Sequence, residues 1–153
     1  MTTIRLHTLL GIKDLPANGM AWHDLIVEGF HPQSLTALAS HLSISEEELL
    51  ANFGETIPVG GTRLSIPLSN VLYRLARALR ELQAVNRGDV GAAYGWLQTR
   101  QAMLKGRVPV GLLLSQLGTE FVMTAISRLV PAEPPEVPPA DEDADEESIP
   151  AVE

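Results

Sequence analysis

The stretch LSNVLYRLARALRELQAV, residues 68–85, decides the fold class of this 153-residue chain. Its apolar side chains recur every three or four residues, which is the spacing of one face of an α-helix. The members of this stripe are Val71, Leu72, Leu75, Ala76, Leu79 and Leu82. The pattern predicts a long helix over residues 68–85 with one buried face.

Two shorter helices are predicted on the N-terminal side of this stretch. The first has Pro32 in its first turn and a stripe at helical spacing. That stripe consists of Leu35, Leu38, Ala39 and Leu42. The second begins at Ser45, because Ser45 and Glu48 have the spacing of a capping box. Residues 55–67 hold two prolines and two glycines and are predicted to form a loop or hairpin.

Three further helices are predicted on the C-terminal side. Asp89 has the side chain of an N-cap and starts a helix that runs through Leu97. The next helix covers residues 109–117, and Gly118 is a residue type that ends helices. Its stripe is Val110, Leu113, Leu114 and Leu117. Thr119 then caps the last helix, whose stripe is Val122, Ala125, Ile126 and Leu129. The fold class predicted is all-α.

Charge is distributed unevenly along the chain. The net charge is −8, but residues 1–130 carry 11 Lys and Arg against 10 Asp and Glu, a net charge of +1. Residues 131–153 carry nine acids, six prolines and no base. Such a composition cannot bury enough apolar surface to offset the entropy of ordering. A disordered acidic tail is therefore expected after residue 130, and the acidic character of the chain belongs to this tail.

The sequence contains none of the residue patterns that mark an enzyme. It has no cysteine, and its four histidines lack the spacing of metal ligands. No nucleophile elbow, P-loop or dinucleotide-binding glycine motif occurs, so we expect no catalytic residue, no metal and no cofactor. The N-terminus has no apolar run of signal-peptide length, and a cytoplasmic protein is expected.

Two stretches together resemble the Xre/MbcA/ParS-type antitoxins, the partners of RES-domain toxins. Residues 29–54, GFHPQSLTALASHLSISEEELLANFG, and 63–82, RLSIPLSNVLYRLARALREL, are similar to the Xre-like helix-turn-helix region of that family. Residues 92–122, AAYGWLQTRQAMLKGRVPVGLLLSQLGTEFV, are similar to its toxin-binding domain. That pattern is a Trp-Leu pair, a Gly-Arg-x-Pro turn, a Leu-rich helix and a glycine before the final helix.

The resemblance implies an antitoxin of a type II toxin–antitoxin pair. Such a protein would be a homodimer that holds a RES-like, NAD-consuming toxin inactive. It also implies a division into an N-terminal extension (1–29), an Xre-like domain (30–86), a toxin-binding domain (87–130) and the acidic tail (131–153). The residues expected to contact the toxin are Trp96, Lys105, Arg107, Arg128, Glu133 and Glu136. Trp96 could instead be a core aromatic between two helices. Glu133 and Glu136 belong to the tail, which could instead be a solvated appendage without a partner.

DNA binding is the property on which this sequence departs from the family pattern. The family's turn and recognition helix hold a basic run, whereas the stretch corresponding to it, residues 55–63, is shortened and offers only Arg63 as a base. Arg74 and Arg77 on the long helix could add phosphate contacts or could form a solvated face. A recognition helix needs several donors for the major groove and cations for phosphates. Weak or absent specific DNA binding is therefore expected.

Three classes of function follow from these patterns. A toxin-neutralising protein, either an antitoxin or an immunity protein of the same fold, is favoured by the toxin-binding-like half and the acidic tail. A DNA-binding transcriptional regulator without a toxin needs a recognition helix that the sequence has lost. An enzyme has no set of residues behind it.

Overall fold

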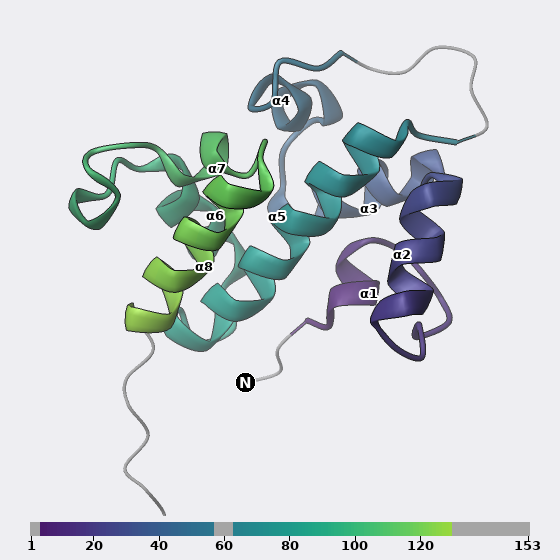
Figure 1. Ribbon diagram of the computed structural model, residues 1–153, viewed down its shortest axis with the longest axis horizontal. Helices are drawn as coiled ribbons and strands as arrows, with labels where there is room; N and C mark the ends of the chain where they lie inside the picture. Colours follow the sequence, from purple (N-terminus) through teal and green to yellow (C-terminus); the bar gives the residue numbers. More distant parts are fainter. Residues whose placement is uncertain (1–3, 57–62, 130–153) are drawn as a thin grey trace, which may run out of the picture.

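The computed structural model describes residues 4–56 and 63–129, and within these ranges the regular structure is helical. Helix α5 (Ile66–Val85) crosses the middle of the molecule, as Figure 1 shows. On one side lie α1 (Leu6–Leu9), α2 (Gly19–Glu28) and α3 (Pro32–Leu42), with α4 (Glu46–Ala51) above them in the view of Figure 1. On the other side lie α6 (Val90–Gln98), the short 3₁₀ helix η1 (Ala102–Leu104), α7 (Pro109–Leu112) and α8 (Gln116–Leu129). The predicted all-α class is confirmed.

Helix α5 forms the centre of one continuous hydrophobic core. All six residues of its predicted stripe are buried, and five of them are fully enclosed. The helix packs against α1 and α2 on one side and against α6 and α8 on the other. It begins two residues earlier than predicted, because the side chain of Ser65 accepts a hydrogen bond from the backbone N–H of Leu68 at 3.2 Å and caps the first turn.

The predicted caps are also present. The hydroxyl of Ser45 accepts a hydrogen bond from the N–H of Glu48 at 3.0 Å, and the carboxylate of Asp89 accepts one from the N–H of Ala92 at 3.0 Å. Each cap satisfies one of the backbone N–H groups that the first turn of a helix leaves free. Helix α6, which starts at the second of these caps, ends at Gln98, one residue beyond the predicted end at Leu97.

Residues 4–29, most of the predicted N-terminal extension, contribute several side chains to the core. Leu6, Leu9 and Leu10 are buried, as are Trp22 and Ile26 of α2. Gln83, buried near the end of α5, fixes the start of the chain with two hydrogen bonds to the backbone of residue 4. Its side-chain oxygen accepts from the Ile4 N–H at 2.7 Å, and its amide donates to the Ile4 carbonyl at 3.1 Å.

The predicted boundary between the last two helices is wrong. Helix α7 ends at Leu112, and α8 begins at Gln116, so Gly118 and Thr119 lie inside α8 instead of ending or capping a helix. The physical reason is Ser115, whose hydroxyl accepts a hydrogen bond from the N–H of Gly118 at 2.9 Å and takes the capping role. As a consequence Leu114 and Leu117, two members of the predicted stripe, are exposed, whereas Val110 and Leu113 are buried as predicted.

No helix in the described part of the chain combines the length and apolar character needed to cross a membrane. The stretch 55–63, on which the prediction about the recognition helix rests, lies mostly outside the described residues. The acidic tail lies outside them entirely.

Candidate functional site

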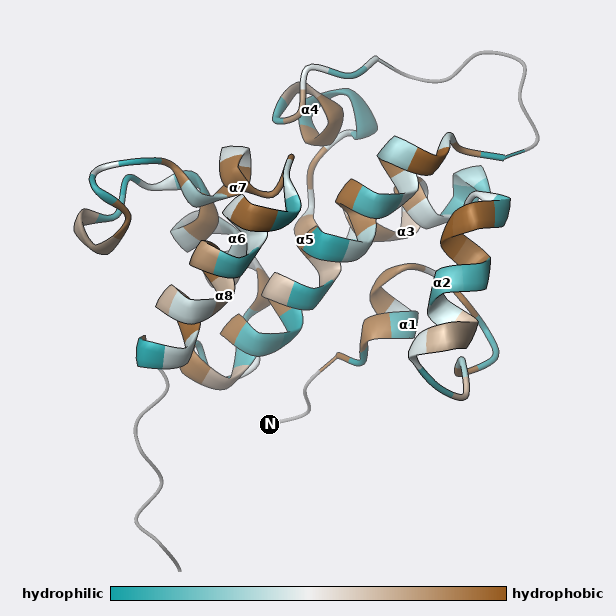
Figure 2. Ribbon diagram, in the orientation of Figure 1, coloured by the Kyte–Doolittle hydropathy of each residue, from teal (hydrophilic) through white to brown (hydrophobic). Residues whose placement is uncertain are grey.

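A groove between the loop that carries η1 and the N-terminal half of α8 is the clearest candidate binding surface. Its volume is about 480 Å³, and we call it the C-terminal groove. The residues that line it are Met103, Leu104, Lys105, Arg107, Leu112, Ser115, Leu117, Gly118 and Phe121. The lining combines apolar side chains with two cations and contains no acid. Figure 2 shows hydrophobic segments at the η1 loop and on α7, on the side of α5 that carries α8.

The groove exposes an unusual amount of apolar side chain. Leu117 is 64% exposed, Phe121 57% and Met103 45%. Leu117 and Phe121 are four residues apart on α8, so they form a second apolar stripe beside the buried one. Clustered exposure of large apolar side chains marks a surface that another molecule covers.

Lys105 and Arg107 are held in place by the backbone of the loop between α6 and α7. The N–H of Gln101 donates to the carbonyl of Arg107 at 3.1 Å, and the N–H of Gly106 donates to the carbonyl of Gln101 at 2.9 Å. Lys105 has a φ of 59°, in the left-handed region, so the chain reverses between the two cations. Both side chains are exposed at the edge of the groove. The loop therefore presents two positive charges beside an apolar surface.

The opposite wall depends on a close approach between α7 and α8. A Cβ atom placed on Gly118 would lie 2.2 Å from the carbonyl oxygen of Leu112, which no side chain can occupy. Arg74 of α5 reinforces the turn by donating to the carbonyls of Leu113 at 3.2 Å and Leu114 at 3.3 Å. The absence of a side chain at Gly118 lets the end of α7 lie directly against α8, and Arg74 satisfies two carbonyls at the end of α7.

The structure brings together some of the expected contact residues and separates others. Lys105 and Arg107 both line the groove, whereas Trp96 is half-buried against the core and does not line it. Arg128 is exposed in the last turn of α8, beyond the groove. Glu133 and Glu136 lie outside the described residues.

The three arginines considered for DNA make contacts within the chain. Arg63 donates to the carbonyl of Gly29 at 3.1 Å and lies 3.8 Å from the carboxylate of Glu28. Arg74 donates to the turn after α7, as described above. Arg77 lies over the ring of Tyr73, with the guanidinium carbon 6.0 Å from the ring centroid. The backbone and ring contacts occupy these guanidinium groups at least in part.

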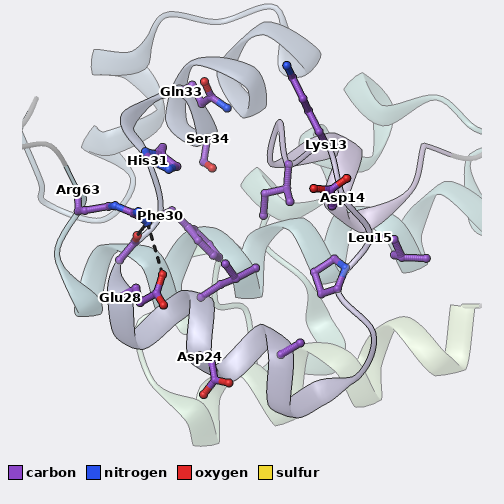
Figure 3. Close-up of a pocket in the computed structure, with 15 residues that line it drawn as sticks. Lys13, Asp14, Leu15, Asp24, Glu28, Phe30, His31, Gln33, Ser34 and Arg63 are labelled. Atoms are coloured by element: carbon purple, nitrogen blue, oxygen red, sulfur yellow. Dashed lines mark hydrogen bonds and ion pairs between the residues drawn. The ribbon is translucent and has the colours of Figure 1, made fainter.

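A second cavity, of about 500 Å³, lies at the N-terminal end of the molecule and is shown in Figure 3. The loop after α1, helix α2 and the start of α3 form its walls, and Arg63 and Glu28 face each other at one side (Figure 3). Its lining mixes acids, bases and apolar groups. Of the residues predicted to contact the toxin or DNA and described by the structure, only Arg63, a DNA candidate, lines this cavity. Arg63 is held by its contacts with Gly29 and Glu28.

Tyr94 connects the two sides of the molecule through its hydroxyl group. The side-chain amide of Asn52, just after α4, donates a hydrogen bond to the Tyr94 hydroxyl on α6. Burial raises the pKa of Tyr94; the hydrogen bond from Asn52 opposes this shift, and the nearby charge of Glu48 adds to it. The phenol therefore stays neutral at physiological pH and acts as a structural connection.

The binding surface formed by the exposed apolar residues Met103, Leu117 and Phe121 is not predicted from the sequence. One available signal was the presence of two apolar stripes on a single short helix, since a helix at the surface of a domain buries only one. Among the described residues no group of three or more His, Asp or Glu side chains is arranged to hold a metal ion.

Comparison with known families assigns this part of the chain. Residues 81–129 match the family model of the antitoxin Xre/MbcA/ParS C-terminal toxin-binding domain. A search of curated proteins gives no significant match. The match begins near the end of α5 and ends with the last residue of α8, so it contains every residue that lines the C-terminal groove. Residues 81–129 of this chain are therefore similar to the toxin-binding domain of the Xre/MbcA/ParS antitoxins, which supports the resemblance to that family.

Proposed function

We propose that this protein is the non-enzymatic antitoxin of a type II pair and that it neutralises a RES-like, NAD-consuming toxin. The observation that carries the proposal is the coincidence of the family match with the exposed apolar groove. An immunity protein of the same fold would use the same surface, so the proposal covers both forms of neutralisation.

The C-terminal groove is the proposed centre of the toxin contact. Leu117 and Phe121 supply apolar surface, and Lys105 and Arg107 supply charge at its edge. Buried aromatic and aliphatic anchors with charged residues around them are the common composition of protein interfaces. Arg128 extends the basic surface along α8, and Trp96 supports the domain from behind by packing against the core.

The acidic residues Glu133 and Glu136 are proposed to enter the substrate site of the toxin. A site that binds a dinucleotide pyrophosphate presents cations, and carboxylates can compete for them. This contact would speed association at low salt, because exposed charges are screened beyond about 8–10 Å at physiological salt. The proposal also includes a homodimer, which light scattering of the purified protein tests.

Neutralisation is tested by a substitution that changes the groove without changing the core. Leu117→Glu places a charge in the groove at a residue that is 64% exposed, so the fold should be preserved. Removing an interface anchor typically costs at least about 2 kcal/mol, or roughly 30-fold in affinity. Met20→Glu is the matched control, because Met20 is 68% exposed on α2, on the other side of α5.

The readouts are growth of cells that co-express the toxin encoded beside this protein and loss of NAD in a mixture of the two purified proteins. We expect Leu117→Glu to lose protection and Met20→Glu to keep it. Equal protection by both variants would contradict the groove assignment. A toxin that leaves NAD intact would contradict the RES-like identity alone.

DNA binding has one structural observation in its favour and one against it. Helices α3 and α4 are joined by only three residues, 43–45, a connection of the length found in helix-turn-helix units. If α4, in place of the stretch 55–63, were the recognition helix of such a unit, the three glutamates of its first turn would lie where side chains approach base edges. Carboxylates there would be repelled by phosphates, so we propose neutralisation without strong DNA binding.

A further inference from the structure

The C-terminal groove holds two cations without acidic partners in the part of the chain that the structure describes. The ion pairs among those residues join Arg63 to Glu28 and Arg80 to Glu81, and neither involves Lys105 or Arg107. The groove thus combines apolar walls with a positive edge. A matching ligand would be an extended segment with apolar groups on one side and carboxylates on another.

The chain carries such a segment directly after α8. Residues 133–139 read EPPEVPP, with four prolines, one valine and two glutamates. Proline favours the polyproline II conformation, which has three residues per turn. In that conformation Glu133 and Glu136 lie on one edge of the segment, and Pro134 and Val137 lie on the next. The period of the segment therefore separates its charges from its apolar groups.

The length of chain allows this segment to reach the groove. From Phe121 to Leu129 α8 rises about 12 Å, at 1.5 Å per residue. An extended segment advances about 3.1 Å per residue, so residues 130–133 can span the same distance in the reverse direction. Glu133 would then lie near Phe121, and Glu136 would lie a further turn along, toward Leu117 and the loop with Lys105. The acids at 141–147 have no proline among them, so that stretch lacks the residue type that favours the polyproline II conformation.

We propose that in the free protein residues 133–139 occupy the C-terminal groove of the same chain. The carboxylates of Glu133 and Glu136 pair with Lys105 and Arg107, and Pro134 and Val137 cover Leu117 and Phe121. Tethering makes this contact intramolecular, with an effective concentration of the order of millimolar, so even a weak intrinsic affinity fills the groove. A partner that binds the groove must displace the segment, which then becomes available for other contacts.

This contact is a property of the free protein and does not depend on the proposed toxin. The chain has no cysteine, so Ala140→Cys gives a single site for a nitroxide label next to the segment. The measurement is the loss of amide NMR signal intensity that the nitroxide causes in the full chain, compared with the same sample after its reduction. We expect loss at Lys105, Arg107 and Phe121, recovery of these signals at high salt, and recovery in Lys105→Glu/Arg107→Glu.

Arg128→Glu is the matched control, because Arg128 is nearer to the start of the segment but does not line the groove. This variant should keep the loss. Glu133→Gln/Glu136→Gln tests the same contact without changing any residue of the described fold, and it should restore the signals. Intact signals at the groove, or losses that Arg128→Glu relieves as strongly as the groove variant, would overturn the proposal. A sample in which the chains observed by NMR lack the nitroxide and are mixed with nitroxide-labelled chains is a further test. Signal losses of the same size in this mixture would also overturn the proposal, since they would mean that the segment of a second copy fills the groove.

Discussion

Gly118 offers the sharpest test of how the C-terminal helices are packed. In Gly118→Ala the new Cβ would lie 2.2 Å from the carbonyl oxygen of Leu112, against an ordinary contact of 3.4–4 Å. The overlap exceeds 1 Å, and the atom it meets belongs to the backbone and not to a flexible side chain. Helices α7 and α8 must therefore move apart.

The expected loss of stability is the difference of two effects. Forcing an extra group into a packed site costs about 1–3 kcal/mol, with larger values where the backbone must shift. Replacing glycine by alanine inside a helix raises the free energy of unfolding by about 1 kcal/mol, because alanine has the higher helix propensity. Because the clash is with backbone, we expect a net loss of about 2 kcal/mol in the free energy of unfolding. For a domain of this size that corresponds to a fall of about 8 °C in melting temperature.

Gly95→Ala is the matched control for this measurement. Gly95 is an exposed residue inside α6, and a Cβ atom placed on it would meet no other atom within 4 Å. The same substitution should therefore stabilise the protein by up to about 1 kcal/mol. Denaturant unfolding followed by far-UV circular dichroism measures both variants. If Gly118→Ala is as stable as Gly95→Ala, then Gly118 is an ordinary helix-end glycine and the close packing of α7 on α8 is refuted.

Three further outcomes are expected. Ser45→Ala should lower the free energy of unfolding by about 1 kcal/mol, because the N–H of Glu48 loses its cap, and a loss below the error of denaturant unfolding would contradict the cap. In a Tyr73→Phe background, which leaves Tyr94 as the one tyrosine, its phenolate absorbance should appear above the usual pH range of a tyrosine. Asn52→Ala should raise the pKa of Tyr94 further, because the hydrogen bond that it removes lowers this pKa. Stability should fall as the pH rises above the unfolded pKa of about 10, because the unfolded chain releases the Tyr94 proton first. A mobility-shift titration with upstream promoter DNA at about 150 mM salt should show no sequence-specific complex at nanomolar protein, since the few available cations give little phosphate neutralisation. Such a complex would show that a recognition element exists outside Arg63, Arg74 and Arg77.

The elements that sequence predicted well are those whose determinants are local. The stripe of α5 and the caps at Ser45 and Asp89 depend on residues within one or two turns, and the structure has all three. Residues 4–29 were less readable because their order comes from distant contacts. Gln83 is 79 positions from Ile4, and no local pattern shows that its amide fixes the start of the chain.

The boundary between α7 and α8 failed for a related reason. The leucines at 113, 114 and 117 fit one helical stripe, and Gly118 is a common helix terminator, so the local pattern favoured a continuous helix to residue 117. What decides the boundary is the cap at Ser115 together with the backbone contact of Gly118 and the arginine from α5. The approach of Gly118 to Leu112 and the hydrogen bond from Arg74 to Leu113 both join different parts of the fold. The spacing of residues along the sequence does not show such contacts.

Arg74 shows how this limit applies to the candidate site. As a basic residue on a helix, Arg74 is a candidate for phosphate contacts, and nothing in its sequence neighbourhood excludes them. In the structure its guanidinium donates to two carbonyls 39 and 40 residues away. These bonds fix the turn that carries Leu114 and precedes the first residue of α8, Gln116. Helix α5 thus supplies both the centre of the core and a contact that shapes the segment matching the family model. Helices α6 and α8 pack their apolar faces against α5 and would lose that cover without it.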